Sequence, residues 1–158
     1  RDEVTRMVGV GAVIFSTLYN QRIKDVVFVW DKILSFDGET GPYVQYTHAR
    51  CCSLLNKVNA DISSPDPARI CDEPALDLLR ELTRYDDVIA DAADKYEPSV
   101  VARYSMAVAQ AFNRFYHEDQ INTEDEALRS SRLYLVSMAE RILRDTLTVL
   151  GMDAPEQM

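Results

Sequence analysis

The last third of the chain carries an apolar pattern that constrains the fold more than any other feature of the sequence. Apolar side chains recur there at steps of seven residues, in two adjacent rows: Leu128, Leu135, Ile142 and Val149, beside Val136, Leu143 and Leu150. This spacing predicts one long helix, and so wide a buried face needs several packing partners. Gly151 is suited to end the helix, and Pro155 follows it.

Similar patterns predict helices in most of the remaining chain. We expect them over residues 2–18, 31–36, 42–58, 72–85, 86–96, 98–117 and 123–150, with a loop at 59–71. Asp86 and Asp87 resemble a helix cap, and residues 123–126 (TEDE) fit a capping box. Residues 26–30 (VVFVW) predict either a short strand or merely extended chain. The predicted fold is all-α: an antiparallel helical bundle with a short extended segment near the N-terminus.

The stretch 35–50, SFDGETGPYVQYTHAR, is the strongest candidate for a functional site. In a helix starting near Pro42, the side chains of Tyr43, Tyr46 and Arg50 lie within about 60° of one another around the axis. Two phenol rings and a guanidinium on one face can stack on nucleobases and reach phosphates. The structural alternative is that both tyrosines are half-buried at the edge of the core and Arg50 is a solvated charge.

The charge distribution points to a local site rather than to a generally basic surface. The formal net charge is −9, which argues against a general nucleic-acid binder. From Thr40 to Ala60, however, there is no acidic residue, although the chain has 26 of them. His48, Arg50 and Lys57 lie in this acid-free window, so the sequence favours function at the tyrosine–arginine face.

Cysteine and histidine usage gives no sign of a disulfide framework or a metal centre. The three cysteines, an odd number, form no CxxC pair, which is typical of a reducing cytoplasm. His48 and His117 have no evident partners at ligand spacing, so no metal site is expected. The sequence contains no run of 18 apolar residues, so it predicts no membrane span. Because the chain opens with Arg1 in helix-like sequence, we expect it to be part of a longer protein.

Several of these segments together resemble a known family. The runs VGVGAVIFSTL, NQRIKDVVFVWDKILSFDGETGPYVQYTHAR, AVAQAFNRFY and LGMDAPEQM are similar to the C-terminal part of class I arginyl-tRNA synthetases. Residues at the family's spacing include Phe36, Gly38, Pro42, Tyr43, Gln45, Tyr46 and Arg50. The chain departs from the family at residues 25–30, where two usually polar positions are apolar. The family's HIGH and KMSKS signatures are absent.

The resemblance implies a division of the chain and a set of binding residues. Residues 1–36 correspond to the tail end of the catalytic or connecting region, and 37–158 to a helical anticodon-binding domain. The implied partners are the anticodon stem-loop of tRNA(Arg) and the catalytic domain of the same parent chain. Candidate RNA-binding residues are Tyr43, Tyr46, Arg50, Asn113, Tyr116, His117 and Met158. No catalytic residue is expected, and ATP, Mg²⁺ and arginine are implied for the parent enzyme alone.

Alternative interpretations remain open at this point. Asn113 could be an interior helix amide, Tyr116 a core tyrosine and Met158 a cap on the bundle end. The whole chain could be a helical protein-interaction module, which would need an exposed apolar patch. It could also be the equivalent bundle of a related class I synthetase such as the cysteinyl enzyme.

Overall fold

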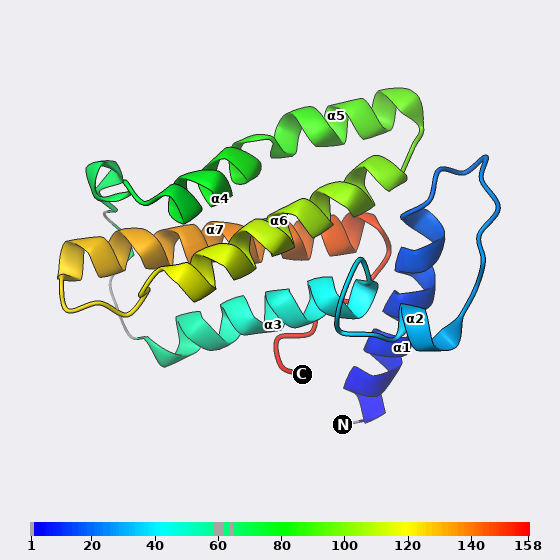
Figure 1. Cartoon of the computed structure of the whole chain (residues 1–158), viewed down its shortest axis with the longest axis horizontal. Coiled ribbons are helices and arrows are strands. Elements are labelled where there is room, and N and C mark those ends of the chain that lie inside the picture. Colours follow the sequence, from blue (N-terminus) through cyan, green and yellow to red (C-terminus); the bar gives the residue numbers. More distant parts are fainter. Residues whose placement is uncertain (1, 59–61, 64) are drawn as a thin grey trace.

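Helices carry most of the described part of the chain, which comprises residues 2–58, 62–63 and 65–158 of a computed structural model (Figure 1). In chain order they are α1 Asp2–Leu18, α2 Trp30–Ile33, α3 Gly41–Lys57, the 3₁₀ helix η1 Pro67–Arg69, α4 Glu73–Thr83, α5 Tyr85–Lys95, α6 Ser99–Glu118 and α7 Glu126–Val149. The all-α prediction is confirmed. Part of the predicted 59–71 loop, residues 59–61 and 64, lies outside the described residues.

The bundle is centred on α6 and α7, which run in opposite directions through the middle of the molecule (Figure 1). Helix α3 packs along one side of this pair, and α4 and α5 lie on the other. Fully buried side chains from several helices fill the space between them, including Leu78, Phe112, Phe115, Leu133 and Leu143. Amphipathic stripes on each helix therefore meet in one core, as the sequence predicts.

The predicted stripe of α7 is buried along its middle, but Leu128 at its start is only partly buried and Val149 at its end is not buried. Ile142, Leu143 and Leu150 are buried, but Val149 is 57% exposed. In a straight α-helix, residues spaced seven apart are offset from one another by about 20° around the axis. After three such steps the last residue of a row has turned away from the core. Leu147, one turn after Leu143, is buried and continues the second row of the stripe instead.

Two predicted helix starts differ from the observed ones. The cap of α7 is Asp125 rather than Thr123, because its carboxylate accepts the amides of Ala127 and Leu128 at 3.1 Å each. Asp86 and Asp87 lie within the first turn of α5 and do not cap it. The predicted end of α7 is confirmed, since Gly151 has φ +75° and the Gly151 and Met152 amides donate to Thr148 and Leu147.

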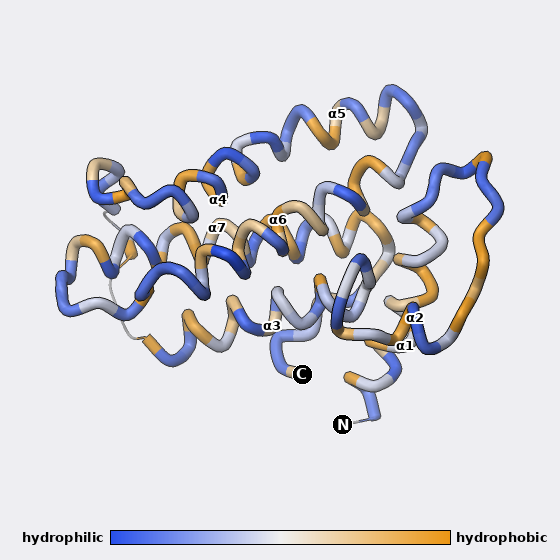
Figure 2. The backbone as a smooth tube through the Cα atoms, viewed as in Figure 1, coloured by the Kyte–Doolittle hydropathy of each residue, from blue (hydrophilic) through white to orange (hydrophobic). Residues whose placement is uncertain are grey.

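The segment before α2 is extended chain rather than a strand. Residues 25–29 have no regular structure, and the described residues contain no strand. From Val26 to Val29 the chain is apolar (Figure 2), yet Val27 is 86% exposed. The extended alternative therefore holds, and the following helix is shorter than predicted.

Helix α1 crosses the start of α3 at close range because two glycines meet there. A Cβ atom on Gly41 would lie 2.8 Å from the carbonyl oxygen of Gly11 and 2.9 Å from Cβ of Phe15. Gly9, two residues before Gly11, has open space around it. The contact fixes the entry of the chain into α3 and hence the position of the candidate site. None of the described helices is both long and apolar enough to cross a bilayer.

Candidate functional site

A hollow of about 810 Å³ lies between α3 and α6. Its lining comes from both helices, from the turn before α3 and from the C-terminal residue: Phe36, Asp37, Tyr43, Tyr46, Arg50, Gln110, Asn113, Arg114, His117 and Met158. Six of the seven predicted site residues line this hollow, and the remaining one, Tyr116, contacts Arg50. We call it the Arg50 hollow.

The first turns of α3 carry Tyr43, Tyr46 and Arg50 into the hollow as their spacing predicts. The helix starts at Gly41 because the Thr40 hydroxyl accepts the amide of Tyr43 at 3.2 Å and Pro42 needs no partner in the first turn. Tyr46 is 41% exposed, while Tyr43 and Arg50 are partly buried. Tyr43 thus has the half-buried position of the structural alternative, whereas Tyr46 is more open to solvent.

Arg50 is held between two aromatic rings. Its Cζ atom lies 4.9 Å from the ring centre of Tyr46 on the same helix and 5.0 Å from that of Tyr116 on α6. Its Nη1 donates to Asn113 Oδ1 at 2.7 Å. Cation–π contacts of this kind orient the guanidinium plane and stabilise it at a partly exposed site. The remaining N–H groups of the fork are then available to a ligand.

Asn113 connects the two helices at the base of the hollow. Its Nδ2 donates to the Tyr43 hydroxyl at 2.9 Å and to Thr47 Oγ1 at 3.0 Å, and its Oδ1 accepts from Arg50. Because these three hydrogen bonds engage both ends of its side-chain amide, Asn113 serves more to position neighbouring side chains than to contact a ligand itself. Because the Tyr43 oxygen accepts from Asn113, its own O–H is left to donate.

Tyr116 and His117 continue the aromatic surface on α6. The Tyr116 ring stacks on Phe112 at 6.2 Å and meets His117 edge-on at 5.4 Å, both between ring centres. At 36% exposure Tyr116 is neither a core residue nor a free side chain. Its position lets a flat ligand contact the ring and Arg50 together.

The charges around the hollow single out Arg50. Arg114 pairs with Asp77 at 2.6 Å and with Glu118 at 3.1 Å, so its charge is compensated. No carboxylate among the described residues forms an ion pair with Arg50. Asp37 also lines the hollow and places one negative charge there. The acid-free window therefore contains a guanidinium, that of Arg50, without a carboxylate partner among the described residues. Asp37 lies just before this window in the sequence.

The C-terminal segment reaches the hollow because α3 anchors it. Gln45 Nε2 donates to the Asp153 carbonyl at 2.8 Å, and His48 Nδ1 lies 3.0 Å from the Pro155 carbonyl. We call Gln45 and His48 the tail anchor. They bring Met158 to the edge of the hollow, although the sequence gave no signal for either contact.

Four lining residues were not predicted as site residues: Phe36, Asp37, Gln110 and Arg114. Phe36 meets Tyr46 edge-on at 6.1 Å and was noted only for its spacing within the resembled family. The expectation that His48 lacks a partner at ligand spacing was wrong. Cys52 lies one helical turn further along α3, and Glu140 of α7 contacts the same imidazole. Because His48 is buried, it adds no solvent-exposed charge to the acid-free window.

Comparison with known proteins identifies the family of the chain. The profile of the DALR anticodon binding domain matches residues 44–158. Arginine–tRNA ligases of Halothermothrix orenii and Clostridioides difficile are 45% and 48% identical over 100% and 99% of this chain. The chain spans 28% of the length of each of these relatives.

Solved structures give the same result. The arginyl-tRNA synthetase of Thermus thermophilus superposes with a TM-score of 0.93 at 35% identity, over 99% of this chain and 27% of that one. The Plasmodium falciparum arginyl-tRNA synthetase, at 22% identity and a TM-score of 0.88, shares the fold over 99% of this chain and 28% of its own. The chain therefore belongs to the DALR anticodon binding domain family, and it matches the part of arginine–tRNA ligases that contains this domain.

Proposed function

We propose that the Arg50 hollow binds the anticodon stem-loop of an arginine tRNA. The contacts come from Tyr43, Tyr46, Arg50, Asn113, Tyr116, His117 and Met158. An anticodon loop presents unstacked bases, which proteins bind by stacking and by hydrogen bonds to the exposed base edges. Tyr46 and Tyr116 supply stacking surfaces, Arg50 a planar donor, and the Tyr43 hydroxyl a second donor.

The observation that carries the proposal is the guanidinium of Arg50 between two partly exposed tyrosine rings. It has an aromatic surface on each side and no carboxylate partner among the described residues. An RNA loop offers both flat bases and phosphates to such a group. A protein-interaction module would need only an apolar patch, whereas this hollow also holds a guanidinium and the hydrogen-bonding side chains of Tyr43 and Asn113.

The rest of the proposal concerns the protein of which the chain is a part. We assign residues 37–158 to the anticodon-binding domain and 1–36 to the end of the catalytic or connecting region. The parent is then a cytoplasmic arginine–tRNA ligase that uses ATP, Mg²⁺ and arginine in domains outside this chain. Exposed apolar side chains on and before α2, with Val10 and Val13 of α1, suit contact with its catalytic domain.

A gel-shift titration tests the binding proposal directly. The 158-residue chain is titrated into an arginine-tRNA anticodon stem-loop and into the same hairpin with its middle anticodon base changed. We expect tighter binding of the unchanged hairpin, because a changed base can still stack but loses the hydrogen bonds to its edge. Equal affinity for both hairpins contradicts sequence-specific binding in the hollow.

Arg50→Ala in the same assay isolates the guanidinium. The slope of log affinity against log salt should become shallower by the amount expected for the loss of about one phosphate contact. Arg103→Ala is the matched control, since Arg103 lies 5.8 Å from the Tyr19 ring on another part of the bundle. If the Arg50 variant has the same affinity and the same salt slope as the control variant, RNA binds elsewhere on the chain.

A further inference from the structure

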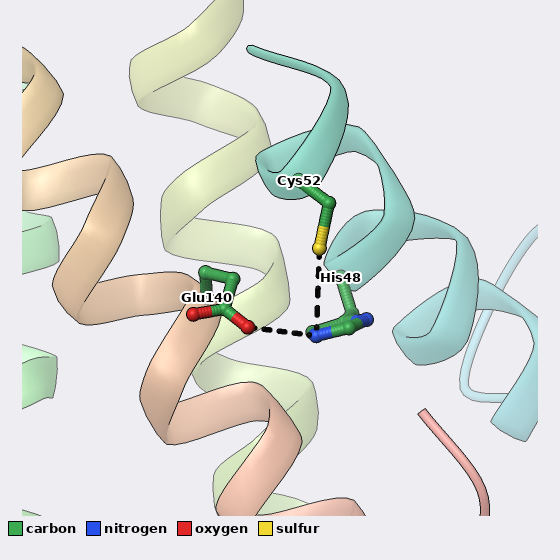
Figure 3. A group of neighbouring side chains, drawn as sticks. All are labelled: His48, Cys52 and Glu140. Atoms are coloured by element: carbon green, nitrogen blue, oxygen red, sulfur yellow. Dashed lines mark hydrogen bonds and ion pairs between the residues drawn. The ribbon is translucent and has the colours of Figure 1, made fainter. Parts of the chain in front are cut away.

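A second group of reactive side chains lies on the opposite side of α3 from the Arg50 hollow. His48 and Cys52 of α3 face Glu140 of α7 (Figure 3). His48 Nε2 is 3.1 Å from Glu140 Oε1 and 3.7 Å from Cys52 Sγ, and the three ligand atoms lie within 4.8 Å of one another. His48 and Cys52 are buried, and the Glu140 side chain is mostly so. We call these residues the His48 cluster.

The hydrogen bonds of His48 leave a place for a cation. The Pro155 carbonyl can only accept, so Nδ1 carries a proton and donates to it. In the neutral ring Nε2 is then an acceptor, and it faces the oxygen of a carboxylate. Two acceptors at this distance repel each other unless a positive species lies between them. That species is either a proton or a metal ion.

The donor set and its spacing favour a metal of the zinc type. Imidazole nitrogen, thiolate sulfur and carboxylate oxygen are the usual zinc ligands, and their bonds of about 2.0–2.3 Å put ligand atoms about 3.3–3.6 Å apart in a tetrahedron. The two separations from His48 Nε2, 3.1 Å to Glu140 Oε1 and 3.7 Å to Cys52 Sγ, are close to these values, and the remaining one, within 4.8 Å, closes by rotation of the Glu140 and Cys52 side chains. A metal-binding histidine also commonly donates its other nitrogen to a backbone carbonyl, as His48 does to Pro155.

We propose that His48 Nε2, Cys52 Sγ and the Glu140 carboxylate bind one zinc-like divalent cation, with water in the fourth position. A thiolate and a carboxylate neutralise the two charges of the ion, so the filled site is uncharged and suited to burial. The Arg144 guanidinium, which lies 3.0 Å from Glu140 Oε1, is half-exposed and can turn toward Asp145 when the ion takes its place.

Binding must release protons, which gives the site a measurable signature. A metal-bound cysteine is a thiolate, whereas an ordinary free cysteine is a thiol at neutral pH. The S–H bond breaks, its proton goes to the buffer, and the sulfur lone pair forms the bond to the metal. We therefore expect release of about one proton or more per ion. Because His48 also holds Pro155, the bound ion joins α3, α7 and the C-terminal segment.

Titration with Co²⁺, a spectroscopic substitute for Zn²⁺, tests the site. The chelator-treated 158-residue chain, carrying Cys71→Ser to remove the exposed thiol, is titrated while absorption is recorded. We expect visible bands of tetrahedral Co²⁺ and a near-ultraviolet thiolate charge-transfer band, saturating at one ion per chain and lost on adding Zn²⁺. Absence of the charge-transfer band overturns the proposal, because a proton then fills the gap. The buffer dependence of the binding enthalpy gives the number of protons released.

Variants assign the ligands. Cys52→Ser should abolish the charge-transfer band, and Glu140→Gln should weaken Co²⁺ binding by more than about tenfold. Cys51→Ala is the matched control: its thiol is the adjacent one in the sequence, is fully buried and lies outside the cluster. A band that survives in Cys52→Ser, or that is lost in the folded Cys51→Ala chain, contradicts the assignment. Circular dichroism establishes folding of each variant, and the readout does not depend on RNA binding.

Discussion

Two sides of helix α3 use polar residues for opposite purposes. On one side, Gln45 and His48 are buried and their side chains hold the C-terminal segment. On the other side, Tyr46 and Arg50 are partly open and their polar atoms are only partly engaged. Both pairs lie within two turns of the same helix.

The difference shows what separates a structural polar residue from a candidate binding residue. A buried polar group must find a partner within the protein, because leaving it unpaired costs about 1–3 kcal/mol. A polar group at a rim can keep donors for a ligand at little cost, because water satisfies them meanwhile. Burial, rather than residue type, thus separates the two sides: Gln45 Nε2 and both nitrogens of His48 have protein partners, although the buried Gln45 Oε1 has none among the described residues.

The largest expected effect comes from the glycine contact that sets the start of α3. Gly41→Ala should lower the free energy of unfolding by about 3 kcal/mol, because its Cβ would meet backbone atoms of α1 that cannot move away. Urea denaturation measures the change. Gly9→Ala, with open space around the new methyl, should instead stabilise the chain by about 0.5–1 kcal/mol. Similar stability changes for both substitutions contradict the close approach.

The open side of the comparison depends on Tyr116. Tyr116→Ala should weaken binding of the anticodon hairpin by about 1–3 kcal/mol, the usual contribution of one base–aromatic stack. Tyr134→Ala is the matched control, because Tyr134 is 39% exposed against 36% for Tyr116 and lines a different, apolar hollow on α4 and α7. Fluorescence anisotropy of labelled hairpin measures both. Equal losses for the two variants remove the stacking argument.

Sequence reasoning predicted the fold well where a periodic pattern reports directly on burial. The α6 stripe is buried throughout, since Val101, Val108, Phe112 and Phe115 repeat at the helical period. It failed where the outcome depends on tertiary context. The VVFVW segment has strand composition, but no partner strand lies beside it in the described chain. Val149 continues the seven-residue spacing of its row, but in a straight helix this spacing turns its side chain away from the core.

The site was predictable in part for the same reason. Tyr43, Tyr46 and Arg50 share a helix, so their common face follows from geometry alone. Their meeting with Asn113 and Tyr116 depends on how α3 packs on α6, which only family resemblance implied. Arg114 and Gln110 enter the hollow through that packing and carry no signal of their own. Of the partners of His48, Cys52 stands four residues on and could have been noticed in the sequence, whereas Glu140 and Pro155 are far away in the sequence.

A smaller effect is expected at the residue that the tail anchor brings to the hollow. Met158→Ala should weaken hairpin binding by about 0.3–1.5 kcal/mol, the range of a sulfur–aromatic contact. The free energy of unfolding should stay unchanged, because the side chain is exposed. Comparing the anisotropy titration with urea denaturation separates the two quantities. A loss of stability without a loss of affinity assigns Met158 to closing the bundle end.

The smallest expected signal is in amino-acid activation, where neither side of α3 has the required chemistry. Adenylate formation needs donors that stabilise the charge developing on the α-phosphate. The sequence has no glycine-rich phosphate loop leading into a helix. We therefore expect no arginine-dependent ATP–pyrophosphate exchange by the 158-residue chain, with the full-length Clostridioides difficile relative as positive control. Exchange above background would contradict this expectation and would mean that polar groups of this chain, on one side of α3 or the other, stabilise the α-phosphate.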